Sequence, residues 1–225
     1  MPETSSEEKE WKKFLDFLSE RDEDAQTNQD LASILKFFRT EDRHFPCGEN
    51  RRELFRLELL ARYNDVWAIE ALYTIYKNGW FVKKSFLEYL RWLMRGADHG
   101  IVSAMIELAE LLAKGNECCP KNVRRSYVYF SKAAILLDPY AFCRTGDFYR
   151  DGLYVTEDPK TAFTLYRYAE DRSEVISCCD DVKKEIYQRL AECCQKGIGT
   201  PCDMDQAGHY RNMLVKKERK SDERQ

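Results

Sequence analysis

The feature that most constrains the fold of this 225-residue chain is a spacing that recurs along it. Within residues 141–169, small and aromatic residues mark a first helix. Gly152 should end that helix, because glycine adopts the left-handed conformation of a helix end at little cost. Asp158 and Pro159 then supply the N-cap and the first residue of a second helix. Glycines that can play the same role stand at 79, 115, 152 and 197, at intervals of 36, 37 and 45 residues. The sequence therefore predicts repeated pairs of short helices.

The residues that carry this spacing resemble the Sel1-like repeat, a relative of the tetratricopeptide repeat. The matching positions in the clearest copy are Ala141, Gly146, Tyr149, Gly152, Asp158, Ala162, Tyr166 and Ala169. Thr145 stands where this family usually has leucine, and Tyr154 where it usually has a second glycine. The resemblance implies an all-α fold, a right-handed superhelical solenoid of antiparallel helix pairs.

Four repeats are expected, over about 65–99, 100–137, 138–170 and 184–217, with an insertion at 171–183 that accounts for the longest interval. Small residues such as Gly146 should let the two helices of a pair approach closely. Residues 1–64 should form N-terminal capping helices with a degenerate repeat, including helices from about Glu7 and over Gln29–Arg39. Such elements are expected because a helix stack exposes an apolar face at each end. Residues 218–225 read as a polar tail.

The charges of the chain are nearly balanced, with 36 basic and 39 acidic residues. No bulk field therefore attracts it to nucleic acid or to a membrane surface. The first 30 residues are the acidic exception. No signal-like stretch opens the sequence, and no apolar run approaches the roughly 20 residues of a membrane span. Nine cysteines, an odd number without an export signal, favour free thiols and a cytoplasmic location.

Catalytic and metal chemistry find little support in the sequence. Cysteine zinc sites usually space their ligands by two to four residues, whereas the cysteines at 118–119, 178–179 and 193–194 are adjacent. Cys202 and His209 come closest to a nucleophile and its base, but a loop cysteine beside a helix-capping aspartate is more often incidental. We therefore expect no catalytic residues, no metal, no cofactor and no enzymatic activity.

A nucleic-acid surface would need a basic stripe with interleaved aromatic side chains. The best fragment contains Lys121, Arg124 and Arg125 with Tyr127 and Tyr129. The balanced net charge argues against this reading, and nucleic acid is the least favoured partner.

The resemblance also implies where a partner would bind, because tetratricopeptide proteins line a concave groove with fixed positions of each first helix. Carried over to this chain, those positions are Ala71, Thr74, Asn78, Glu107, Glu110, Lys114, Arg144, Asp147, Asp151, Arg189, Glu192 and Lys196. A lining of mixed charge suits a charged peptide or protein segment. The alternative is that these side chains are merely solvated.

On this resemblance, the expected function is that of a non-enzymatic protein–protein interaction module, an adaptor, scaffold or regulatory binder. A cognate inhibitor, such as an immunity protein that occludes the active site of a toxin, is the alternative. The acidic N-terminal region would suit occlusion of a basic site. The expected partner is another protein or a peptide segment, and not a membrane.

Overall fold

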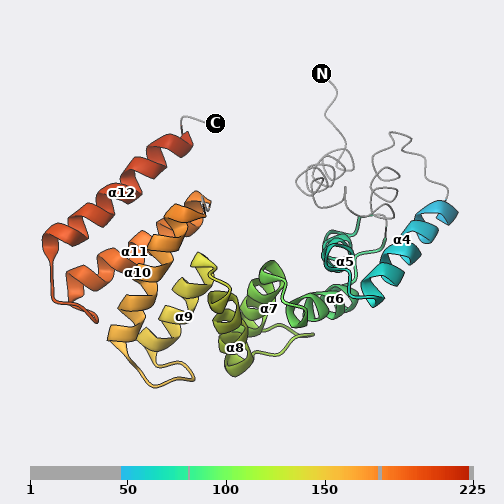
Figure 1. The fold of residues 1–225 in the computed structure, drawn as a ribbon, viewed down its shortest axis with the longest axis horizontal. Coiled ribbons are helices and arrows are strands. Elements are labelled where there is room, and N and C mark those ends of the chain that lie inside the picture. Colours follow the sequence, from blue (N-terminus) through green and yellow to red (C-terminus); the bar gives the residue numbers. More distant parts are fainter. Residues whose placement is uncertain (1–46, 81, 177–178, 223–225) are drawn as a thin grey trace. The chain divides into compact units, whose positions relative to one another are not determined.

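The computed structural model describes residues 47–80, 82–176 and 179–222 of the chain (Figure 1). Within these ranges the protein is helical and has no strand, as the sequence predicts. The chain divides into two compact units, Met1–His99 and Gly100–Gln225. The helices expected near Glu7 and over Gln29–Arg39 lie outside the described residues, as do the last three residues of the tail.

The first unit contains three described helices, α4 (Cys47–Arg62), α5 (Val66–Asn78) and α6 (Phe86–Asp98). Helix α5 pairs with α6, and α4 packs on α5. The side chain of Asp65 caps α5 by accepting a hydrogen bond from the Ala68 amide at 2.8 Å. The α4 residues that face the core include Leu57 and Ala61, which are fully buried.

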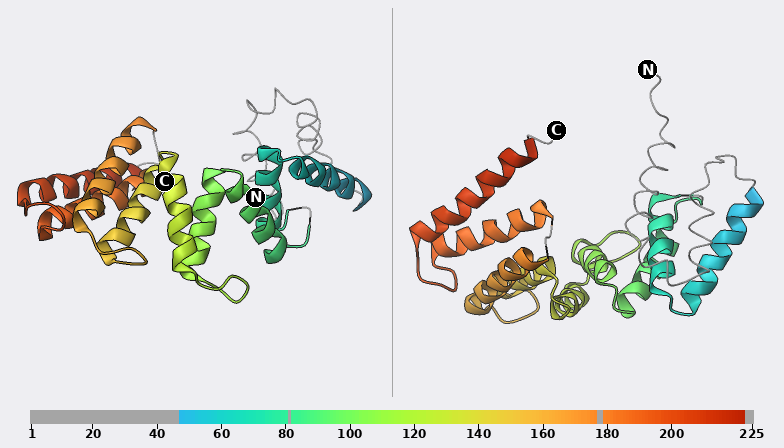
Figure 2. Two further views of the ribbon diagram at one scale, coloured as in Figure 1. Left: turned by 60° about the horizontal axis from the view of Figure 1, so that its bottom comes forward. Right: turned by 45° about the horizontal axis from the view of Figure 1, so that its top comes forward.

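The second unit consists of three helix pairs whose members contact each other along their length (Figure 2). Helix α8 also packs on α9, and α10 on α11, so each pair covers the apolar side of its neighbour. The helices are α7 (Val102–Lys114), α8 (Val123–Ile135), α9 (Pro139–Asp151), α10 (Pro159–Val175), α11 (Asp180–Lys196) and α12 (Met204–Asp222).

The predicted glycines do end the first helix of each pair. Gly79, Gly152 and Gly197 adopt the left-handed conformation at the ends of α5, α9 and α11. Gly115 also has a positive φ, of 73°, but its ψ of 156° is extended, so the turn after α7 takes a different path. Equivalent corners of successive pairs therefore carry equivalent residues.

Gly146 allows the close approach that the sequence predicts between α9 and α10. A Cβ atom on this residue would lie 2.6 Å from Cε1 of the Tyr166 ring. Tyr166 is fully buried in a cluster that also contains Cys143, Leu190 and Cys193. The missing side chain at 146 thus makes room for the largest fully buried side chain of the unit.

Longer helices account for the longest interval between the glycines. Helices α10 and α11 have 17 residues each, whereas α7, α8 and α9 have 13. Four extra residues in each of two helices give eight, which is the difference between intervals of 45 and 37. The described part of the segment at 171–183 therefore lengthens two helices, leaving only a short connection between them.

Candidate protein-binding surface

The first helices of the three pairs in the second unit, α7, α9 and α11, are linked by polar side chains. Tyr140 on α9 donates a hydrogen bond to the Glu110 carboxylate on α7. Arg189 on α11 binds Asp147 on α9 through two parallel bonds of 2.7 Å each. We call the side of the second unit formed by α7, α9 and α11 the first-helix face.

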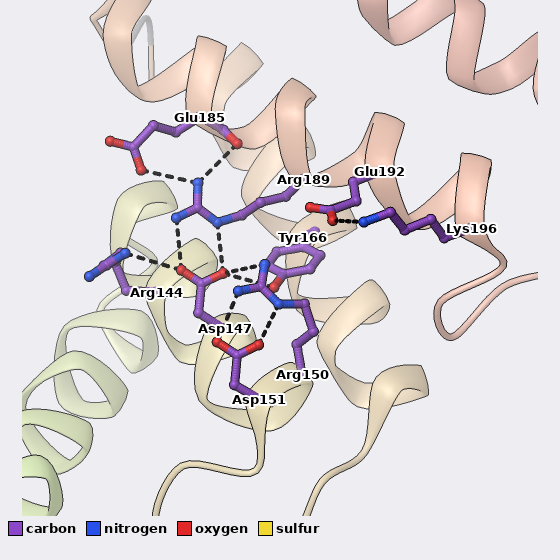
Figure 3. Close-up of polar contacts among 9 residues, drawn as sticks. All are labelled: Arg144, Asp147, Arg150, Asp151, Tyr166, Glu185, Arg189, Glu192 and Lys196. Atoms are coloured by element: carbon purple, nitrogen blue, oxygen red, sulfur yellow. Dashed lines mark hydrogen bonds and ion pairs between the residues drawn. The ribbon is translucent and has the colours of Figure 1, made fainter.

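Asp147 is the centre of the largest polar cluster on this face (Figure 3). Besides the two bonds from Arg189, its carboxylate receives a bond of 3.1 Å from Arg144. It also lies 3.3 Å from a guanidinium nitrogen of Arg150 and accepts a hydrogen bond of 2.9 Å from the Tyr166 hydroxyl. One carboxylate therefore joins α9, α10 and α11.

The cluster is electrically balanced although it is largely buried. Only 12 % of the Asp147 side chain and 14 % of the Arg189 side chain are exposed. Arg150 also binds Asp151 through two bonds of 2.7 and 2.9 Å, and Arg189 bonds to the Glu185 carboxylate at 3.1 Å. Three arginines thus face three carboxylates, which compensates the cost of removing these charges from water.

The electrostatics of the cluster keep its donors protonated. Burial, and then the charge of Asp147, raises the pKa of Tyr166, so its hydroxyl remains a donor at neutral pH. Burial alone would lower the pKa of Arg189, but its hydrogen bonds with Asp147 and the nearby anionic groups raise it overall. These groups are held in place as structural donors, and their pKa values are far from those of a general acid or base at neutral pH.

Arg144 differs from the other two arginines because it has a single carboxylate partner. Its side chain is 30 % exposed, against 27 % for Arg150 and 14 % for Arg189. Its guanidinium lies over the rings of Phe130 and Tyr140, at 5.7 and 5.9 Å from their centroids. Cation–π contacts of this kind orient the group. Arg144 therefore presents a pre-ordered cation at the surface.

Two exposed ion pairs complete the charged surface of this face. Lys114, with 76 % of its side chain exposed, pairs with Glu110 at 3.4 Å on α7. Lys196, with 58 % exposed, pairs with Glu192 at 2.6 Å on α11. Glu107 lies one turn before Glu110 on α7 and is half-buried. Both signs of charge are therefore accessible to a partner.

The predicted positions on α5 belong to the first unit, and their side chains bond to their own helix. The Thr74 hydroxyl donates to the Glu70 carbonyl at 2.8 Å, and the Asn78 amide donates to the Thr74 carbonyl at 3.0 Å. Ala71, expected beside them in the groove, is 1 % exposed and packs in the core instead.

Three members of the Asp147 cluster, Arg150, Tyr166 and Glu185, were not among the residues expected on this face. Arg150 stands three residues after Asp147, and Glu185 four residues before Arg189. Such spacings make neighbours on a helix surface, so both could have been found from the sequence. Tyr166 reaches Asp147 from α10, and only the packing of α9 on α10 reveals that contact.

Among the described cysteines, Cys119, Cys143, Cys193 and Cys194 are buried, whereas Cys118, Cys179 and Cys202 are exposed. Burial raises the pKa of Cys143 to about 12 and that of Cys193 to about 11, which keeps both thiols protonated and unreactive. The Cys202 thiol donates to the Gln195 carbonyl, while the His209 ring packs edge-on against Tyr210. Among the described side chains, no group of three or more histidine, cysteine, aspartate or glutamate residues is placed to hold a metal ion.

In the basic fragment around Arg124 and Arg125, neither Tyr127 nor Tyr129 is available to stack on a nucleic-acid base. Tyr129 is buried, with its ring under Lys132, and so cannot stack on a base. Tyr127 packs against Phe148 at a centroid distance of 5.4 Å and bonds to the Tyr149 hydroxyl. The exposed cations of α8 therefore lack the stacking platform that binding of single strands requires.

In the part of the chain that the structure describes, every helix is too short or too polar to span a membrane.

Comparison with known proteins identifies the repeats. The family model of the Sel1 repeat matches residues 102–136, 139–173 and 187–210. A Schizosaccharomyces pombe protein, named as a candidate component of an ERAD-associated E3 ubiquitin-protein ligase, is 31 % identical over 101 residues. That match covers 44 % of this chain and only 13 % of the yeast protein.

Two solved structures share the fold. One is c5321, a protective antigen of uropathogenic Escherichia coli that displays an SLR fold, with a TM-score of 0.63 and 21 % identity. The other is a Sel1 repeat protein from Oxalobacter formigenes, with a TM-score of 0.62 and 23 % identity. Each match covers 73 % of this chain, but 33 % of the antigen and 62 % of the Oxalobacter protein.

Proteins built from Sel1 repeats generally mediate protein–protein interactions. The helix pairs of the second unit, their glycine corners and the matched residues agree with one another. The second unit therefore consists of Sel1-like repeats, and its helix pairs have the all-α solenoid fold of such repeats.

Proposed function

We propose that the chain is a non-catalytic binder of another protein, whose partner lies along the first-helix face of the second unit. The observation that carries the proposal is the state of Arg144 on this face. Its guanidinium is oriented by Asp147 and two aromatic rings, yet 30 % of the side chain reaches solvent. An anchor that is ordered before binding loses less conformational entropy when a partner arrives.

The surroundings of Arg144 suit a partner segment that carries charges. Lys114 and Lys196 are the more exposed members of the pairs Glu110–Lys114 and Glu192–Lys196, and ion pairs of this kind contribute only about 0–1 kcal/mol to stability. The two lysines can therefore exchange their intramolecular partner for one on another protein at little cost. A carboxylate on the partner would complement Arg144, and opposite charges would complement the two pairs.

Two forms of this function remain distinct. An adaptor would engage a component of a larger assembly, and the resemblance to the yeast ligase component supports this form. An inhibitor of the immunity-protein type would form a tight equimolar complex with one enzyme or toxin. The stoichiometry of the purified complex separates the two forms.

The test is co-purification of the full chain with its partner from native lysate, followed by affinity measurements with surface variants. The variant Lys114→Glu/Lys196→Glu reverses two exposed charges on the first-helix face. The matched control, Arg124→Glu/Arg125→Glu, reverses two exposed charges on α8. We expect the first variant to weaken binding by at least about tenfold, or 1.4 kcal/mol, and the control to leave it unchanged. Equal effects of the two variants would refute the assignment of the face.

A further inference from the structure

Helix α4 of the first unit has an apolar stripe on the side that faces solvent. Phe55 and Leu59 lie on α4, and Tyr63 directly follows its last residue, with its amide still bonded to the Leu59 carbonyl at 3.3 Å. The three stand at intervals of four residues and are 59, 43 and 80 % exposed. Residues at this spacing are neighbours on one side of a helix. Leu57 and Ala61 already fill the core from the other side. The stripe is therefore surplus to the packing of the described unit.

Helix α6, the second helix of the α5–α6 pair, shows which side chains the equivalent side of another helix carries. Leu93 and Ala97 of α6 are fully buried and correspond to Leu57 and Ala61 of α4, 36 residues earlier. The same offset relates Phe55, Leu59 and Tyr63 to Arg91, Arg95 and His99. On α8 of the second unit, Lys132 interrupts the equivalent row between Val128 and Leu136. Three uninterrupted large apolar side chains are thus peculiar to α4 among these helices.

The charges beside the stripe are mainly basic. Glu58 accepts a hydrogen bond from the Tyr76 hydroxyl at 3.2 Å, and Asp65 caps α5, so both acids are used inside the unit. Arg62 is exposed on α4 next to the stripe, as is Arg56, which already has a partner within the chain. Arg95 adds a third guanidinium by donating to the Arg62 carbonyl at 3.0 Å. An apolar row flanked by guanidinium groups has the composition of a protein interface.

We propose that Phe55, Leu59 and Tyr63 form a docking surface for an amphipathic helix of a partner protein. The partner helix carries apolar residues at intervals of three or four and acidic residues beside them. A single exposed helix offers a ridge that a second helix can pack against along its length. The arginines select acidic neighbours, and tyrosine and arginine are residues that dominate binding energy when an interface buries them. This surface is separate from the first-helix face and does not depend on it.

The test uses a displayed library of helical peptides selected against the full chain. A triple variant, Phe55→Ser/Leu59→Ser/Tyr63→Ser, serves as the counter-target. The control variant is Val128→Ser/Leu136→Ser, which removes exposed apolar side chains from α8. We expect enrichment on the wild type and the control but not on the triple variant. Enriched peptides should carry apolar residues at helical spacing with an excess of Asp and Glu.

Affinities of the enriched peptides complete the test. The triple variant should bind them at least about tenfold more weakly, with an unchanged unfolding midpoint because the replaced side chains are exposed. Equal enrichment on the triple variant, or an excess of Lys and Arg in the peptides, would overturn the proposal. The proposal would also be overturned if the variant Trp11→Ser/Phe14→Ser of the full chain bound the peptides about tenfold or more tightly than the wild type. The stripe would then be a binding site for the chain's own N-terminal segment.

Discussion

Replacing Asp147 by asparagine should destabilise the second unit more than any other single removal of charge on the first-helix face. The change keeps the shape of the side chain but removes the negative charge that faces Arg144, Arg150 and Arg189. Removing one partner of a fully buried ion pair costs about 3–5 kcal/mol. Here Arg189 retains Glu185, and Arg150 retains Asp151. We therefore expect a loss of about 2–3 kcal/mol in the free energy of unfolding.

Urea unfolding followed by circular dichroism measures this loss on the full chain. Asp151→Asn is the matched control, because it makes the same chemical change on the same helix at an exposed ion pair. Its cost should not exceed about 1 kcal/mol. A double-mutant cycle of Asp147→Asn with Arg189→Gln should give a coupling energy of about 1–3 kcal/mol. If Asp147→Asn lies within about 0.5 kcal/mol of the wild type, the cluster does not hold α9, α10 and α11 together.

Further predictions concern packing and thiol chemistry. Gly146→Ala should destabilise the protein by about 1–2 kcal/mol, because the clash with Tyr166 outweighs the gain in helix propensity. Gly208→Ala should stabilise it by about 0.5–1 kcal/mol, because the added Cβ meets no atom within 4 Å. Thermal unfolding that ranks the two variants equally would contradict this. Iodoacetamide at pH 8 should label the exposed Cys202 and leave the buried Cys143 unlabelled until the protein unfolds, as peptide mass spectrometry can show. The pKa of Cys143 is about 12 in the folded chain, against an ordinary value of 9.0 for a solvated thiol, so the unfolded state loses this proton first. The free energy of unfolding is therefore unaffected by this thiol below pH 9 and decreases as the pH rises towards 12. Urea titrations at pH 8 and pH 10.5 should show this decline, and Cys143→Ala should reduce it.

The local features of the fold could be predicted from the sequence because they depend on neighbouring residues. Gly152 ends α9 in the left-handed conformation, and Asp158 caps α10 through the amides of Lys160 and Thr161. Each of these roles is a property of a residue type and of the few residues around it. The all-α fold and the pairing of the helices follow from their repetition.

The role of Asp147 could not be predicted from the sequence in the same way. Its position in the repeat suggests a groove-lining side chain, but its carboxylate is held by Arg189, which is 42 residues away. Tyr166 approaches it from the second helix of the pair, 19 residues later. Burial of this kind arises from the stacking of helices, so a pattern of offsets does not reveal it. For the same reason, Asp147 supports the candidate surface from beneath, while Arg144 reaches solvent beside it.

Hydrogen–deuterium exchange of the full chain, alone and with its purified partner, tests the proposed binding face most directly. The account predicts that within the second unit the partner slows exchange in α7, α9 and α11, and leaves α8, α10 and α12 unchanged. Slower exchange confined to α8, α10 and α12 would contradict it.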